Sequence, residues 1–88
     1  MKYAIVIEKA KRNYSAYAPD IPGCISTGKT VGETKRLMRE AIEFHFESMM
    51  LDGETIPEST SRCSYIDIKL PKLNGKVTVP KRRKAQAQ

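Results

Sequence analysis

The chain has 88 residues, 40% of them apolar, and a formal net charge of +6, which predicts one folded domain. Its sequence contains no apolar run long enough to span a membrane and does not open like a signal peptide, so we expect a cytoplasmic protein. The charge is uneven: residues 1–70 hold ten Lys/Arg and ten Asp/Glu, whereas residues 71–88 hold six Lys/Arg and no acid.

Three short strands are expected first, over residues 2–9, 14–18 and 24–27. The first is rich in β-branched residues, and a polar turn separates it from the second. Short strands that follow one another this closely predict an antiparallel meander.

A rigid turn and a helix start lie on either side of the third strand. Prolines fix φ, and glycine admits turns that residues with a Cβ resist. A threonine three residues before a glutamate has the spacing of a capping box. The residues expected to fix this connection are Pro19, Pro22, Gly23, Gly28, Thr30 and Glu33.

One helix is expected over residues 31–51, ending at Asp52 and Gly53. Its helical spacing places one stripe against the sheet: Val31, Thr34, Met38, Ala41, Ile42, His45 and Met49. A second apolar line consists of Leu37, Phe44 and Leu51. This line predicts either a surface that contacts a partner or a second copy, or packing under the 53–60 loop or the C-terminal segment.

After a loop fixed by Gly53 and Pro57, residues 64–70 alternate between apolar and polar side chains. This pattern predicts a strand with Ile66, Ile68 and Leu70 inward, lying beside the first strand and parallel to it through a right-handed crossover. Residues 76–79 are expected to add a short edge strand. We therefore expect a domain over 1–71 and a basic extension over 72–88 that is partly disordered.

Two motifs flank the helix: Pro19-Asp20-Ile21-Pro22-Gly23-Cys24 with Gly28-Lys29-Thr30, and Gly53-Glu54-Thr55-Ile56-Pro57-Glu58-Ser59. In these motifs and in the order of its elements, the chain resembles the HicB antitoxin family over about residues 3 to 70. The resemblance implies an α+β, β-β-β-α-β partial ribonuclease-H-like fold with a mixed sheet, one helix on one face and no enzyme activity. It also implies a homo-oligomer that covers a small mRNA-cleaving, HicA-type toxin.

Many members of that family continue into a helix-turn-helix or ribbon-helix-helix domain. Only 18 residues follow Leu70, too few for either motif, so promoter binding in that manner is not expected. The toxin-capping half of the family's function is the part that the sequence supports.

Enzyme chemistry, cofactors and metals are not predicted. The strand acids Glu8 and Asp67 and the helical glutamates show no pattern that would bring carboxylates together around metal ions. The single histidine, His45, lies in the sheet-facing stripe and is interpreted as a packed residue. Cys24 and Cys63 match no metal-ligand spacing and are expected to be free thiols.

Two functions remain open. The first is an antitoxin-like binding protein that inhibits its partner by steric occlusion. The second is a small module that binds nucleic-acid phosphates non-specifically through Lys81, Arg82, Arg83 and Lys84. A solvated tail that aids solubility is the alternative interpretation of those four residues.

Overall fold

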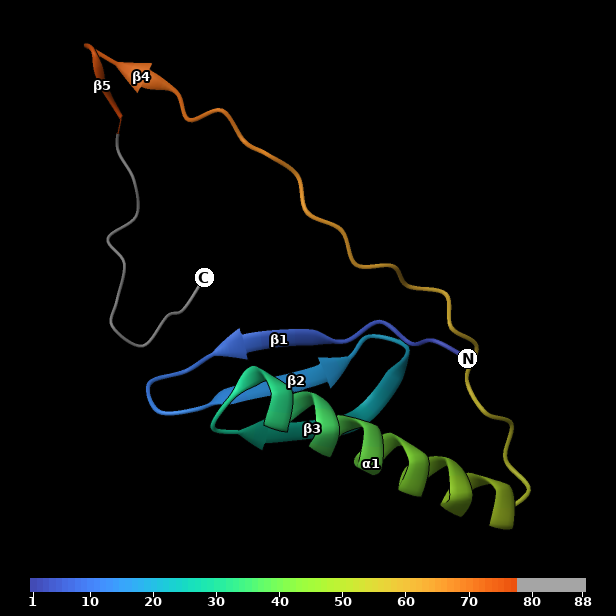
Figure 1. Cartoon of the computed structure of the whole chain (residues 1–88). Helices are drawn as coiled ribbons and strands as arrows, with labels where there is room; N and C mark the ends of the chain where they lie inside the picture. The colour runs from blue at the N-terminus through green and yellow to red at the C-terminus, as the bar shows by residue number, and fades with distance from the viewer. Residues whose placement is uncertain (78–88) are drawn as a thin grey trace.

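A three-stranded antiparallel sheet is followed by one long helix packed on one of its faces (Figure 1). The computed structural model describes residues 1–77 of the chain. Its elements are β1 (Val6–Lys9), β2 (Tyr14–Ala18), β3 (Ile21–Gly28), α1 (Val31–Leu51), β4 (Lys72–Leu73) and β5 (Lys76–Val77). The predicted α+β class, with three strands leading into one helix, is confirmed.

The register of the sheet separates its two faces. Ile7 pairs with Ala16 and Ala16 with Ser26, and this row lies on the face that the helix covers. The neighbouring row, Val6 with Tyr17 and Tyr17 with Ile25, points to the other face. The first strand is shorter than the predicted 2–9, because β2 ends at Ala18 and the proline that follows has no N–H to continue the ladder.

The third strand begins at Ile21, three residues earlier than predicted, because the proline–glycine turn forms part of it. Tyr17 pairs with Ile25, yet the next residue, Ala18, pairs with Ile21. Pro22 and Gly23 therefore lie in an irregular bulge, and Gly23 has a φ of +89°, which favours glycine.

Helix α1 has the predicted bounds, and both of its ends are capped. The Thr30 hydroxyl accepts from the Glu33 N–H at 3.0 Å, while the Glu33 carboxylate accepts from the Lys29 N–H at 2.6 Å. At the other end the Gly53 and Glu54 N–H groups donate to Met50 and Met49 carbonyls, as in a Schellman motif. These bonds satisfy groups that the helix itself leaves unpaired.

The core is small and lies under the first half of the helix. Its buried apolar residues are Ala16, Ala18, Ile21, Cys24 and Met38. Thr34 is fully buried, and its hydroxyl donates to the Thr30 carbonyl at 2.7 Å. Gly28 lies directly against this residue, because a Cβ built there would come within 2.7 Å of the Thr34 hydroxyl.

The predicted sheet-facing stripe is fully buried only in the first half of the helix. Thr34 and Met38 are buried, and the stripe residues beyond them, Ala41, Ile42, His45 and Met49, are half-buried. Val31, in contrast, is exposed. A helix of this length spans about 31 Å, more than the strands beneath it, and its C-terminal part extends past the sheet (Figure 1).

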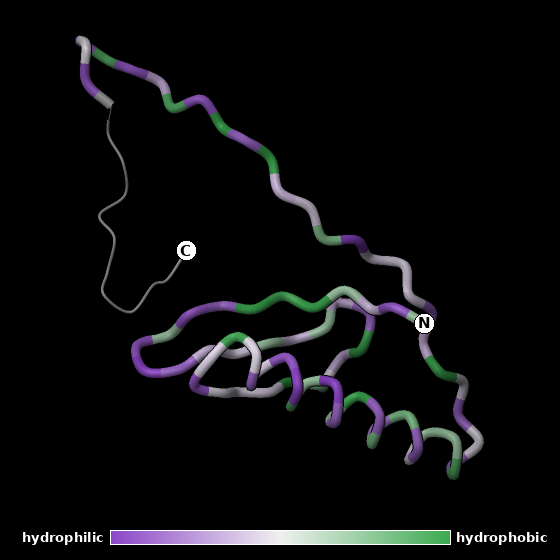
Figure 2. The backbone as a smooth tube through the Cα atoms, in the orientation of Figure 1, coloured by the Kyte–Doolittle hydropathy of each residue, from purple (hydrophilic) through white to green (hydrophobic). Residues whose placement is uncertain are grey.

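The strand predicted over residues 64–70 is absent, and with it the mixed sheet and the parallel pairing to the first strand. Ile66 and Ile68 are 80% and 66% exposed, not inward. The segment runs away from the sheet and the helix (Figure 1). Figure 2 shows that apolar and polar residues alternate along it. The alternation has the period of a strand, but the segment has no neighbouring strand to provide hydrogen bonds.

We call residues 1–63 the body and residues 64–77 the arm. The arm ends in a two-stranded hairpin of β4 and β5 around Asn74 and Gly75, whose φ values are +55° and +74°. The short strand predicted over 76–79 is thus present as Lys76–Val77, although it pairs with β4 and not with the sheet. Residues 78 and 79 lie outside the described part.

Candidate partner-binding surface

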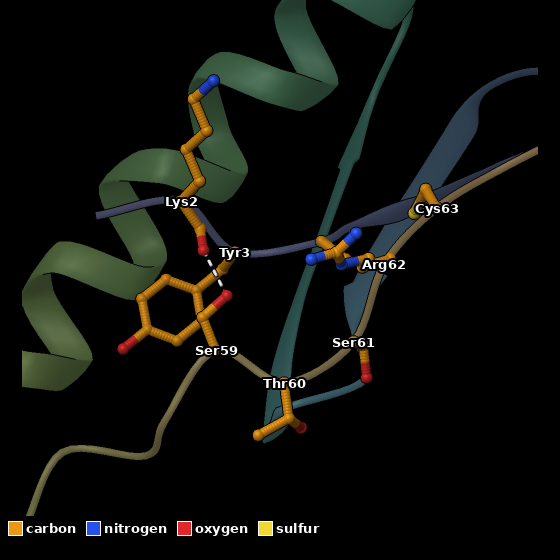
Figure 3. A pocket seen from close by; sticks show the side chains of 8 residues that line it. Lys2, Tyr3, Ser59, Thr60, Ser61, Arg62 and Cys63 are labelled. Carbon is orange, nitrogen blue, oxygen red and sulfur yellow. Dashed lines mark hydrogen bonds between the residues drawn. The ribbon is translucent and has the colours of Figure 1, made fainter.

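The segment after the helix is fixed against the start of the chain. The Tyr3 hydroxyl donates to the Pro57 carbonyl at 2.6 Å, and the Ser59 hydroxyl donates to the Lys2 carbonyl. Further along, the Cys63 thiol contacts the Ile5 carbonyl at 3.4 Å. Residues 59–63 therefore run beside residues 2–5 in the same direction, around a shallow pocket (Figure 3).

Asp20, in the proline–glycine turn, holds the same segment from the other side. Its carboxylate accepts from the backbone N–H groups of Thr60 and Ser61, each at 2.8 Å, and from both of their hydroxyls. The hydrogen bonds from Ser61, followed by those from Thr60, lower the pKa of Asp20 to about 2. Asp20 of the first sequence motif thus contacts the two residues that directly follow the second motif.

The second apolar line of the helix is largely uncovered. Phe44 is 74% exposed and Leu51 is 88% exposed, whereas Leu37 is half-buried. Neither the 53–60 loop nor the described part of the C-terminal segment covers Phe44 or Leu51. Two of the three predicted contact residues are therefore available to a partner.

Acidic residues surround Phe44. The stretch from residue 40 to residue 58 contains six acids and no lysine or arginine. All six are exposed, and Glu40 is paired with Arg36 at 2.9 Å. We define the acidic helix surface as Glu40, Glu43, Phe44 and Glu47, which are close neighbours on α1 at helical spacings of three and four residues. The net charge of residues 1–70 did not indicate this surface, because basic residues elsewhere in that range balance the charge of the glutamates.

An open groove of about 730 Å³ lies between the N-terminal segment and the helix. Its floor is apolar and includes Tyr3, Ile5, Met38, Ile42 and Phe46. The rings of Tyr3 and Phe46 meet edge to face with centroids 5.4 Å apart. The sequence pattern did not predict this groove, because Phe46 lies beside the predicted stripe and helical spacing does not show how much of the sheet the helix leaves uncovered.

The remaining candidate residues fall in different places. Cys24 and Cys63 are free thiols, as predicted, and burial raises the pKa of the Cys24 thiol. His45 is half-buried and its ring lies 6.4 Å from that of Phe46. Within residues 1–77, no three His, Cys, Asp or Glu side chains lie close enough together to hold a metal ion.

Two further predictions concern the basic C-terminal residues and membrane spans. Lys81, Arg82, Arg83 and Lys84, the predicted phosphate contacts, lie outside the described residues. In the part that the structure describes, no helix combines the length and apolar character needed to cross a membrane.

Comparison with known proteins gives one family. The model of the HicB-like antitoxin of bacterial toxin–antitoxin systems matches residues 3–79, which include both the body and the arm. An uncharacterised 14.9 kDa protein of Haemophilus phage HP1 is 43% identical over 67 residues, covering 76% of this chain. The chain spans about half the length of that relative, 50%.

Two archaeal relatives are closer to this chain in length. A UPF0150 protein of Thermoplasma acidophilum is 36% identical over 69% of this chain and 90% of its own length. A UPF0150 protein of Archaeoglobus fulgidus is 41% identical over 64% of this chain and 86% of its own length. No solved structure matches the chain.

Proposed function

Because this chain belongs to the HicB-like antitoxin family, we propose that it neutralises a small mRNA-cleaving toxin of the HicA type. The family match over residues 3–79 is the observation that carries this proposal. Neutralisation is steric: the antitoxin lies over the toxin's RNA site in the cytoplasm and performs no chemistry of its own. Promoter binding is not part of the proposed function.

The acidic helix surface is the proposed contact with the toxin. An enzyme that holds RNA must present a basic surface to the phosphates, and a surface of opposite charge speeds and orients its capture. Phe44 is an exposed aromatic residue among these glutamates, and aromatic residues are common anchors of interfaces. Charge would thus guide the encounter, and Phe44 would hold the complex together.

The first experiment isolates the tagged chain from its native cells, identifies the small protein that co-purifies with it, and measures cleavage of an mRNA by that protein as the antitoxin is titrated in. We expect the two proteins to co-purify and cleavage to stop near one equivalent. Cleavage that continues at full saturation would refute the proposed function.

The second experiment locates the contact. Phe44→Ala should weaken toxin binding by about 10- to 100-fold, the cost of truncating an interface anchor. Glu47→Lys should slow association, most strongly at low salt. Glu8→Lys is the matched control, since it makes the same charge change in β1 and should leave toxin binding unchanged. Wild-type binding by both helix variants would assign the contact to another surface while leaving neutralisation intact.

A second candidate function is non-specific binding of nucleic acid through the C-terminal residues. It is favoured by the six Lys/Arg and the absence of acids in residues 71–88. Phosphate contacts of this kind add affinity without choosing a sequence. This binding could accompany antitoxin activity, because the basic residues concerned are distant in sequence from the acidic helix surface.

A further inference from the structure

The two edges of the sheet differ in how they are protected. The strand order is β1-β2-β3, so β1 and β3 are the edge strands. β3 contains Pro22 and an irregular register, both of which hinder pairing with another strand. β1 consists of Val6, Ile7, Glu8 and Lys9 and contains neither proline nor glycine. Among the described residues, nothing pairs with its outer edge.

The helix-side face next to that edge is also incompletely covered. Helix α1 packs mainly on β3 and β2 and leaves the groove at the N-terminal segment open. Ile5 and Ile7 are only half-buried there. A strand added beside β1 would find backbone hydrogen bonds along its edge and an apolar surface under one of its faces.

The arm has the complementary features. Residues 64–70 alternate between apolar and polar, so an extended conformation places Ile66, Ile68 and Leu70 on one face. All seven residues are exposed, and none has a strand partner among residues 1–77. Seven extended residues span about 23 Å, which is enough to follow the four residues of β1 completely.

We propose that residues 64–70 of one copy pair with the free β1 edge of a second copy, and that the exchange is reciprocal. The chain's own arm does not take this place: residues 59–63 follow residues 2–5, but the chain turns away from β1 after Cys63 (Figure 1). One chain thus carries both an open edge and an unpaired strand. In a two-fold symmetric dimer each copy gives its arm to the partner and receives the partner's arm on its own β1 edge. No open edge and no unpaired arm then remain to add further copies.

Light scattering on the full chain tests the assembly. We expect wild type to have twice the 9.9 kDa mass of one chain. Ile68→Pro removes an N–H and obstructs strand pairing, so it should shift the protein to the single-chain mass. It should leave the circular dichroism of the body unchanged, since residue 68 is outside the core. A wild type of single-chain mass would overturn the proposal.

Phe44→Glu is the control that separates arm exchange from association through the second apolar line of the helix. It changes an exposed residue that does not line the groove beside the N-terminal segment, and it should leave the doubled mass unchanged. If Phe44→Glu halves the mass and Ile68→Pro does not, the copies meet through the helix and arm exchange is wrong.

A mixing experiment distinguishes exchange from an arm that folds back on its own chain. One batch carries Cys63→Ser and Asp67→Cys, with a spin label on the new thiol; the other is unlabelled wild type enriched in ¹⁵N. After mixing, the amides of Val6–Lys9 in the ¹⁵N chain should broaden more than those of the helix. If broadening of β1 occurs only within the labelled chain, detected by giving that chain the ¹⁵N, the arm pairs with its own β1 and the proposal fails.

Discussion

The body and the arm contain similar local patterns but reach different structures. In the body, Ile7, Ala16 and Ser26 alternate with residues of the other face, and each strand lies beside another that satisfies its backbone groups. In the arm, Ile66, Ile68 and Leu70 alternate equally well, yet the segment is exposed and outside the sheet. The comparison shows that alternation describes the face a strand would bury, whereas pairing depends on an available edge. Arm exchange between copies would supply that edge.

The largest contrast is expected between Met38→Ala in the body and Ile68→Ala in the arm. Met38 is 1% exposed, so its truncation leaves a cavity and should lower the free energy of unfolding by about 2–5 kcal/mol. Ile68→Ala should change it by no more than about 0.5 kcal/mol when measured on dissociated chains. Urea titrations of both variants in dilute solution provide the measurement. Equal losses would mean that the arm packs on its own body.

Replacing either of two glycines of the body by alanine should change the free energy of unfolding, in opposite directions at the two positions. Gly28→Ala places a Cβ within 2.9 Å of the Thr34 backbone N, so it should lower the free energy of unfolding by about 1–3 kcal/mol. Gly32→Ala lies in the first turn of α1 with nothing within 4 Å, and alanine's higher helix propensity should raise that free energy by up to about 1 kcal/mol. Thermal unfolding measures both. A loss at both positions would show that the close approach at Gly28 is not the cause.

Asp20 holds the last part of the body from which the arm departs, and its effect depends on pH. Because the folded-state pKa is lowered to about 2, the carboxylate's stabilising contribution is present above its ordinary pKa, about 4, and is lost as the pH falls toward 2. We expect the Thr60 and Ser61 amide resonances of the folded protein to shift with a midpoint near pH 2. In Asp20→Asn they should shift far less, while Asp67→Asn in the arm is the control and should retain the wild-type titration. Identical titrations in Asp20→Asn and wild type would contradict the assignment.

The smallest effect on stability is expected from removing residues 81–88, which contain no predicted core position. The unfolding temperature should not change. Any binding to duplex DNA should disappear, however, and in the full chain four phosphate contacts would give a log–log salt slope of roughly −3 to −4. Tight binding of one DNA sequence by the truncated chain would show that the body recognises bases.

Features whose causes are local can be deduced from the amino-acid sequence alone. The bounds of α1 follow from Thr30 and Glu33 at one end and Gly53 at the other, because caps act within a few residues. The three strands and the burial of Thr34 and Met38 in the helix stripe follow from period and turn chemistry. The spacing of Phe44 and Leu51 also separated them from the sheet-facing stripe, whereas their exposure is a finding of the structure.

Features that depend on residues distant in the sequence become visible only in the folded chain. Asp20 bonds Thr60 and Ser61, which lie some 40 residues further along the sequence, and no local sequence pattern predicts such a contact. The groove beside Tyr3 exists because α1 covers β2 and β3 and leaves β1 partly open. Residues 64–70 have the period of a strand, but a strand needs a neighbour's hydrogen bonds, and the path of the chain after Cys63 takes this segment away from its own sheet.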